Sequence, residues 1–162
     1  MDRALFVVTF LSALGSGLIG GLFFAFSVFV MTALGRISPA AGISAMQSIN
    51  VAVLNPVFFT AFFGTAVLAA LAIVAGLIGW SEPGAGYLLA GGLLYLVGTI
   101  VVTMVCNVPL NDKLARVEPE SDEGALLWQS YLSDWTAWNH VRTIASLAAS
   151  AAFILALVRQ AS

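Results

Sequence analysis

The residues best suited to chemistry lie within 128–146, where the sequence reads WQSYLSDWTAWNHVRTIAS. This stretch holds the only histidine, His140, together with Arg142 and three of the four tryptophans. A histidine near its ordinary pKa can exchange a proton, an arginine can hold negative charge, and tryptophans can stack on flat rings. We therefore take His140, Arg142 and Asn139 as the candidate catalytic residues.

Helical geometry divides this stretch into two faces. Successive residues of a helix are about 100° apart, so residues spaced by three or four share a face. One such face carries an aromatic stripe followed by a cation, and its members are Trp128, Tyr131, Trp135, Trp138 and Arg142. Asn139 joins that stripe, whereas His140 points roughly 160° away from Arg142 on an ideal helix. His140 and Arg142 should therefore not both reach one small target unless the helix is deformed between them. Trp135 and Trp138 are the candidate substrate-binding residues of the stripe.

The depth of this stretch follows from the length of the apolar segment behind it. The charge-free run 143–158 is shorter than the roughly 20 residues that a transmembrane helix needs. The span should therefore begin near Asn139, which places His140 and Arg142 in its outer turns. Ionisable groups at such depth are usually paired or functional. In the alternative interpretation, Arg142 extends to lipid headgroups and the tryptophans form an interfacial belt.

Composition indicates a membrane protein. The 162 residues are 60% hydrophobic and 9% charged, with a mean hydropathy of +1.01, whereas about 25% of residues are charged in soluble domains. We expect a single integral membrane domain, 1–162, in a bacterial inner membrane, with the lipid bilayer as its surroundings. A net charge of −2 argues against nucleic acid as a partner, and the single Cys106 gives neither a disulfide nor a zinc framework.

Charge-free runs and prolines divide the chain into elements. Ser38-Pro39 predicts a helix start and Asn55-Pro56 a break, so 39–54 should form an interfacial helix. The four spans are predicted at about 4–34, 56–79, 86–106 and 139–158, with a second lead-in helix at 124–138. The expected fold is an all-α, four-helix up-down bundle with the interfacial helices on one face and both termini on the same side.

This topology gathers several asparagines at one end of the bundle. Asn55 lies at the predicted break, and Asn107 and Asn111 flank Pro109 at the predicted end of the third span. In an up-down bundle these positions share one face with the Trp/His/Arg stretch, so we expect all three asparagines to contribute to substrate binding. A slight excess of Arg and Lys on this face favours its being cytoplasmic.

The motifs NP at 55–56, NVPLN at 107–111 and WxxWNHxRT at 135–143 resemble a family of small four-helix membrane proteins. That family includes the fungal anthrone oxygenases, and most of its bacterial members form a domain of unknown function. The resemblance covers nearly the whole chain, and its most specific parts are 107–111 and 135–143.

The resemblance implies oxygenation of an anthrone-like, carbanion-forming aromatic substrate by O2, without a metal or flavin cofactor. It implies that His140 is the base, with Trp135, Trp138, Asn139, Arg142, Asn107 and Asn111 around it. The chemistry suits these residue types. A C–H bond that is activated by a carbonyl group and two aromatic rings is acidic, and the anion that its deprotonation leaves reacts directly with O2. Arg142 or an asparagine amide would hold the oxyanion.

Two alternatives from other functional classes stay open. In one, His140 ligates haem or a metal, for example across a homo-oligomer, although one histidine and one cysteine form a weak metal set. In the other, the chain is a structural, accessory or transport protein without chemistry of its own.

Overall fold

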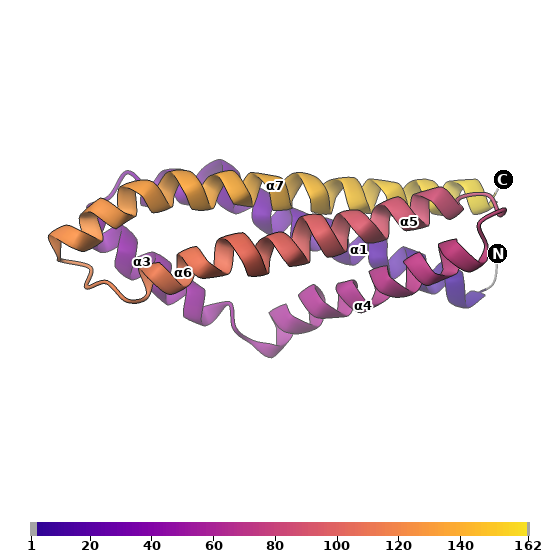
Figure 1. Cartoon of the computed structure of the whole chain (residues 1–162), viewed down its shortest axis with the longest axis horizontal. Helices are drawn as coiled ribbons and strands as arrows, with labels where there is room; N and C mark the ends of the chain where they lie inside the picture. The colour runs from indigo at the N-terminus through magenta and orange to yellow at the C-terminus, as the bar shows by residue number, and fades with distance from the viewer. Residues whose placement is uncertain (1–2, 162) are drawn as a thin grey trace.

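The computed structural model describes residues 3–161, which form helices and connecting turns without any strand. Figure 1 shows the long helices side by side along one axis. The first is continuous through α1 (Arg3–Ala25), the π-helical turn η1 (Phe26–Val30) and α2 (Met31–Leu34). The second is α4 (Pro56–Ile78), the third runs through α5 (Ala85–Leu93), η2 (Leu94–Val101), η3 (Thr103–Asn107) and α6 (Val108–Leu114), and the fourth is α7 (Asp122–Ala161).

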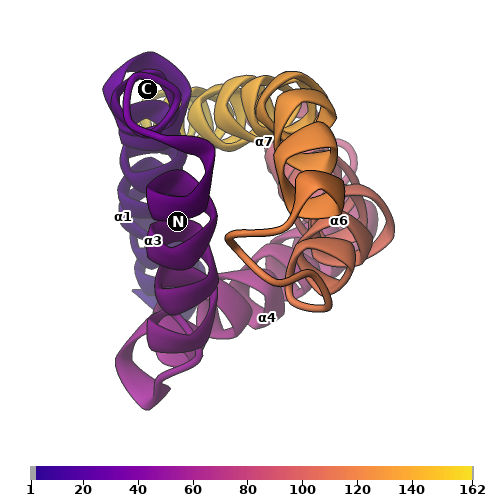
Figure 2. The same ribbon diagram turned by 90° about the vertical axis from the view of Figure 1, so that its left-hand side faces the viewer.

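These helices form a closed ring. Helix α1 packs on α4, α4 on α5, α5 on α7, and α7 again on α1, as the end-on view of Figure 2 shows. Both termini lie at the same end of the bundle in Figure 1. The predicted all-α, four-helix up-down fold is therefore confirmed.

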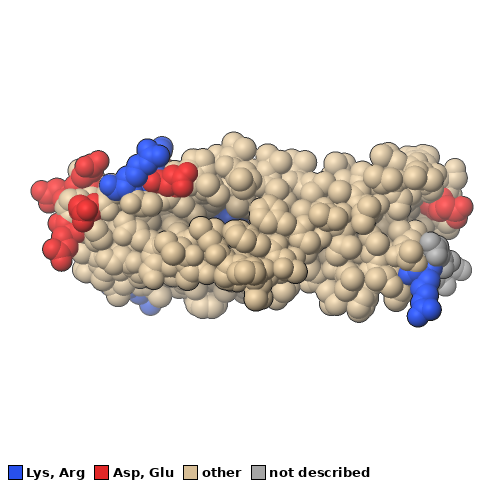
Figure 3. All heavy atoms as spheres, turned by 90° about the horizontal axis from the view of Figure 1, so that it is seen from below, with Lys and Arg blue, Asp and Glu red and all other residues tan. Residues whose placement is uncertain are grey.

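The four long helices are long and apolar enough to cross a membrane. The qualifying stretches are Arg3–Leu34, Pro56–Ile78, Ala85–Leu114 and Asp122–Gln160. On the face shown in Figure 3, the charged side chains gather toward the two ends, and the band between them shows only one small patch of a basic side chain among uncharged ones. Many large apolar side chains on the outside are exposed, which suits a surface that faces acyl chains. These features indicate an integral membrane protein.

The third helix is longer than the predicted 86–106, because Pro109 does not end it. In a regular α-helix the proline ring would clash with the carbonyl four residues earlier. The turn before it is π-helical, and the Val108 N–H bonds to the Thr103 carbonyl five residues back. This wider turn accommodates Pro109, so the helix continues to Leu114.

The fourth helix is also longer than predicted, since the expected lead-in 124–138 and span 139–158 are one helix. Its start is capped by Ser121, whose Oγ accepts the Gly124 N–H at 3.0 Å. Asn139 and Arg142 mark no helix boundary, since α7 runs through both, and both side chains are buried against neighbouring helices. His140, which lies between them in the sequence, is exposed. The depth of these three residues in the membrane stays a prediction.

Helix α3 (Pro39–Ala52) folds back from the end of α2 and packs on α6 and α7. It starts as predicted, with Ser38 Oγ accepting the Ala41 N–H at 3.3 Å and Pro39 in the first turn. The predicted break at Asn55-Pro56 is also present, since α3 ends at Ala52 and α4 begins at Pro56. That α3 lies along a membrane interface stays a prediction.

Two separate clusters of buried apolar side chains hold the molecule together. The bundle core joins α1, α4, α5, η2 and α7, and its buried members are Ala13, Ile19, Phe23, Phe62, Ala69, Ala72, Leu88, Tyr95, Ala149, Phe153 and Ala156. The end core joins α2, α3, α6 and the first half of α7, and consists of Met31, Ile43, Met46, Leu114, Trp128, Tyr131 and Trp135.

Glycines set the closest helix contacts within the bundle core. A Cβ on Gly92 of α5 would overlap Ile73 and lie 2.8 Å from the Ala69 carbonyl oxygen of α4. A backbone atom cannot move aside as a flexible side chain can. Gly92 therefore sets the distance between α4 and α5, as small residues commonly do in membrane helices.

We predict that Gly92→Ala destabilises the folded protein by about 1–3 kcal/mol, because the added methyl group overpacks the α4–α5 contact. The measurement is the thermal midpoint of the detergent-solubilised protein. Gly86→Ala is the matched control on the same helix, since a Cβ there meets nothing within 4 Å. Equal midpoints for the two variants would contradict the packing argument.

Candidate active site

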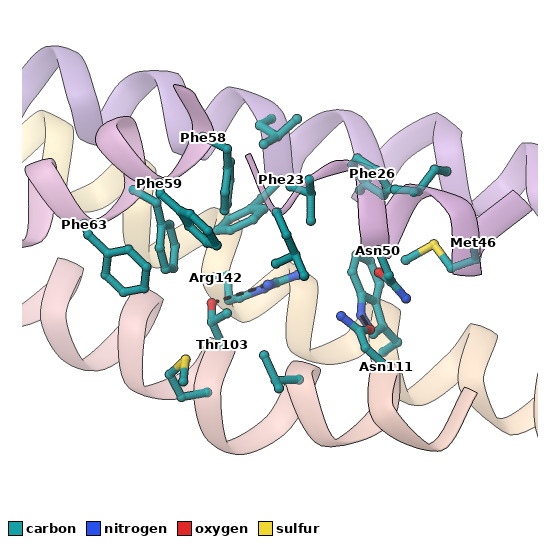
Figure 4. Close-up of a pocket in the computed structure, with 18 residues that line it drawn as sticks. Phe23, Phe26, Met46, Asn50, Phe58, Phe59, Phe63, Thr103, Asn111 and Arg142 are labelled. Carbon is teal, nitrogen blue, oxygen red and sulfur yellow. Dashed lines mark hydrogen bonds between the residues drawn. The ribbon is translucent and has the colours of Figure 1, made fainter. Parts of the chain in front are cut away.

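A cavity of about 400 Å³ lies where the bundle core meets the end core. All four long helices and α3 contribute to its wall (Figure 4). The lining consists of Leu22, Phe23, Phe26, Met46, Ile49, Asn50, Val53, Leu54, Phe58, Phe59, Phe62, Phe63, Thr103, Met104, Val108, Asn111, Trp135 and Arg142. Its volume falls within the roughly 300–1,000 Å³ of small-molecule sites.

The wall of this cavity is aromatic and contains one ionised side chain, Arg142. Phenylalanines from α1, η1 and α4 cover much of it, and the lining includes no histidine, aspartate or glutamate. Figure 4 shows Arg142 reaching Thr103, with Phe58, Phe59 and Phe63 on one side and Asn50 and Asn111 on the other. The cavity is therefore an apolar chamber with a few convergent polar groups.

The Arg142 guanidinium is 4% exposed and lies between two rings. Its Cζ is 4.1 Å from the Phe23 ring centroid and 5.0 Å from that of Trp135. Nη2 donates to Asn139 Oδ1 at 2.6 Å, and Nη1 makes a longer bond of 3.3 Å to Thr103 Oγ1. The Nε–H is buried and has no acceptor among the described residues.

This arrangement holds a cation without a matching anion. Cation–π contacts stabilise a desolvated guanidinium by about 2 kcal/mol, whereas removing a charge from water costs several kcal/mol. Buried charges in proteins are normally paired. The cavity lining offers Arg142 no carboxylate, so an anionic ligand would supply the missing partner for its charge.

Asn139 holds the guanidinium in place from behind. The side chain is fully buried, and its Nδ2 donates to the Phe23 carbonyl at 2.8 Å and to Ser27 Oγ at 2.7 Å. Its Oδ1 accepts from Arg142. The amide therefore ties α7 to α1 and η1 while orienting Arg142, and it does so without lining the cavity.

Asn111 has a similar double role on the α6 side. Its Oδ1 accepts the Tyr131 hydroxyl at 2.8 Å and the Trp135 Nε1–H at 2.7 Å. The Trp135 ring also packs on Phe26, with 5.8 Å between the centroids. Trp135 is thus fixed as a flat wall of the cavity, beside Arg142.

The structure brings together some of the residues expected at the site. Arg142, Trp135 and Asn111 line the cavity, and Asn139 supports Arg142. Trp138 does not belong to this group, because its side chain is exposed on the outside of α7.

The other two asparagines serve the backbone instead. Asn55 caps α4, with Oδ1 accepting the Phe58 N–H at 3.0 Å and Nδ2 donating to the Ala52 carbonyl at 2.9 Å. Asn107 is buried and donates to the Trp135 carbonyl at 3.1 Å, while its Oδ1 has no partner among the described residues. Neither residue lines the cavity.

His140 lies on the exposed side of α7 and does not line the cavity. The uninterrupted α-helical course of α7 keeps the side chain of His140 away from that of Arg142, as the angle between the two positions predicts. Among the described residues, no three His, Cys, Asp or Glu side chains gather as a metal site would require. The role of His140 as a base stays a prediction.

Sequence reasoning missed Asn50, Thr103 and the phenylalanines of α4. Phe58 and Phe62, like Phe59 and Phe63, are four residues apart and so share a helix face, which was the available signal. Asn50 and Thr103 had no distinguishing local pattern. They reach the cavity only because α3 folds back and η3 turns toward α7.

The cavity opens sideways between α4 and η3. Helix α4 packs on α1, α5 and η2 but makes no comparable contact with η3 or α6. Five of the lining side chains are also exposed on the outer surface, and three of them, Phe59 and Phe63 of α4 and Met104 of η3, border this opening; the other two are Leu22 and Leu54. Both edges of this mouth are therefore apolar.

Comparison with known proteins gives one match. The model of the anthrone oxygenase family matches residues 57–152, which include α4, α5, η2, η3, α6 and most of α7. No curated protein and no solved structure matches the chain.

We predict that Arg142→Gln leaves the thermal midpoint of the ligand-free protein equal to or above that of the parent. Removing this charge leaves no buried carboxylate unpaired, and the glutamine amide can still donate to Asn139. Asn139→Leu provides the contrast, because it removes two hydrogen bonds between helices and the bond to Arg142 within α7. It should lower the stability by about 1–3 kcal/mol and the thermal midpoint with it. A large drop in Arg142→Gln would contradict an uncompensated cation.

Proposed function

The chain belongs to the anthrone oxygenase family, and on that premise we propose that it oxygenates an anthrone-like aromatic ketone with O2. The observation that carries the proposal is the Arg142 guanidinium, buried in an aromatic cavity whose lining contains no carboxylate. A planar ketone whose anion carries its charge on oxygen matches both features.

The reaction balances with O2 as the only co-substrate. Loss of a proton from the methylene carbon of the anthrone gives an aromatic oxyanion. That anion transfers electrons to O2, and a hydroperoxide forms at the former methylene carbon. Loss of water from the hydroperoxide gives the quinone, so one anthrone and one O2 yield one anthraquinone and one water.

In this proposal the chain stabilises the anion. The oxyanion binds at Nη1 of Arg142, whose bond to Thr103 is long, while the rings of the substrate stack near Phe23 and Trp135. Arg142 acts in a cavity of low dielectric, where charge interactions are strong. Each 1.4 kcal/mol by which the site binds the anion more tightly than the neutral substrate raises the ionisation constant of the bound substrate tenfold. Asn139 positions the guanidinium and touches no substrate.

The proposal requires no side-chain base in the cavity. The lining contains no histidine or carboxylate, and the released proton passes to water. The rate should therefore rise with pH until the bound substrate is ionised, and this rise should be independent of His140.

The test is oxygen consumption by purified protein with anthrone and 1,8-dihydroxyanthrone. We expect Arg142→Gln to lower the rate by about 10²–10³-fold, as loss of an oxyanion donor does. Ile144→Ala is the control on the same helix, because Ile144 is exposed and outside the cavity. A parent protein that is inactive with every anthrone, or an Arg142→Gln variant of normal rate, would overturn the proposal.

His140→Gln separates the two candidate mechanisms. Because His140 does not line the cavity, we expect its rate and pH profile to match those of the parent. A 10²–10⁴-fold loss, typical of a missing general base, would instead support the role that the family resemblance implies.

A further inference from the structure

The cavity has a second polar region, apart from Arg142. Asn50 of α3 and Asn111 of α6 both line it, and Figure 4 shows them together on the side of Arg142 nearer Met46. Phe58, Phe59 and Phe63 of α4 lie on the opposite side of Arg142. A ligand that fills the cavity therefore meets rings on one side of its oxyanion and amides on the other.

Hydrogen bonding determines which way the Asn111 amide points. A tryptophan Nε1–H can only donate, so the atom 2.7 Å from Trp135 Nε1 must be the oxygen of Asn111. The Tyr131 hydroxyl donates to the same oxygen and occupies its second lone pair. The amide nitrogen of Asn111 has no acceptor among the described residues, and it remains accessible.

Asn50, which belongs to α3, adds a second amide to this region of the cavity. It lines the cavity on the same side of Arg142 as Asn111. An amide carries two N–H donors, so Asn50 can donate to a ligand in the cavity. Tyr131 is almost fully buried, and the bond from its hydroxyl fixes the position of Asn111.

We infer that Asn50 and Asn111 form a donor subsite that binds an oxygen acceptor on the ligand, such as a carbonyl, ether or phenol oxygen remote from the oxyanion. This inference rests on the proposed function for the placement of the oxyanion at Arg142. The two sites together would bind the ligand in one orientation, because its ring edge without oxygen belongs beside the phenylalanines and its oxygen-bearing edge beside the amides. Asn50 and Asn111 would thus determine specificity without touching the reacting carbon.

The test is equilibrium binding of anthraquinones that carry one methoxyl group at successive ring positions. Each is compared with the ethyl compound of the same substitution, which has similar size and no acceptor. We expect the parent protein to bind at least one methoxyl isomer roughly 2- to 10-fold more tightly than its ethyl counterpart, the range for one ordinary hydrogen bond.

Two variants assign that preference to the asparagines. Asn50→Leu removes one amide, and Asn111→Asp keeps the oxygen that Tyr131 and Trp135 require while replacing the donor. Both should lose the methoxyl preference, whereas Ser48→Ala, an exposed position of α3 outside the cavity, should retain it. If Asn111→Asp does not fold, Asn50→Leu alone decides.

A methoxyl preference that is absent in the parent, or that survives either asparagine substitution, overturns the subsite. The outcome is distinguishable from failure of the proposed function, because it measures quinone binding and not turnover. The subsite can fail while the parent still consumes oxygen, and the methoxyl preference can persist in a protein that oxygenates no anthrone.

Discussion

The hydrogen bonds of the Asn139 amide are the constraint on which the rest of the site depends. One nitrogen bonds to the backbone of α1 and to Ser27 of η1, and one oxygen bonds to Arg142. The same group therefore sets the distance between the first and fourth helices and the direction of the buried guanidinium. In an apolar surrounding each of these bonds is costly to leave unmade. The position of the cation is thus coupled directly to the packing of the bundle.

Two π-helical turns, η1 and η3, also contribute side chains to the site. Phe26 of η1 and Thr103 of η3 both line the cavity, and both come from turns in which hydrogen bonds reach back five residues instead of four. Such turns are frequent at functional sites, because they change the direction of side chains without ending a helix. Here η3 also allows Pro109 to lie within a long helix, which keeps Asn111 on the same helix as Thr103.

Sequence reasoning recovered what depends on local pattern and missed what depends on tertiary contact. The four spans, the start of α3 at Ser38-Pro39 and the break at Asn55-Pro56 follow from charge-free runs and proline stereochemistry. The ends of the third and fourth spans do not, since polar residues at 107–111 and 139–142 could equally mark a membrane boundary or face another helix. On α7 the angular argument correctly separated His140 from Arg142, whereas Trp138 lies at the edge of the stripe and is exposed. Asn50 could be assigned to the cavity only once α3 was seen to fold back.

The sideways mouth between α4 and η3 affects which ligand concentration, in lipid or in water, is relevant to binding. Its edges, Phe59, Phe63 and Met104, are apolar and lie on helices that are apolar enough to cross a membrane. A solute that entered between them from the acyl chains would have its occupancy of the cavity governed by its mole fraction in lipid. Consider two compounds that bind equally tightly from lipid but differ tenfold in their lipid–water partition coefficients. Their concentrations in water at half-saturation of the cavity would then differ tenfold. Adding lipid to the sample would dilute either compound within the membrane and weaken its apparent binding without altering the site.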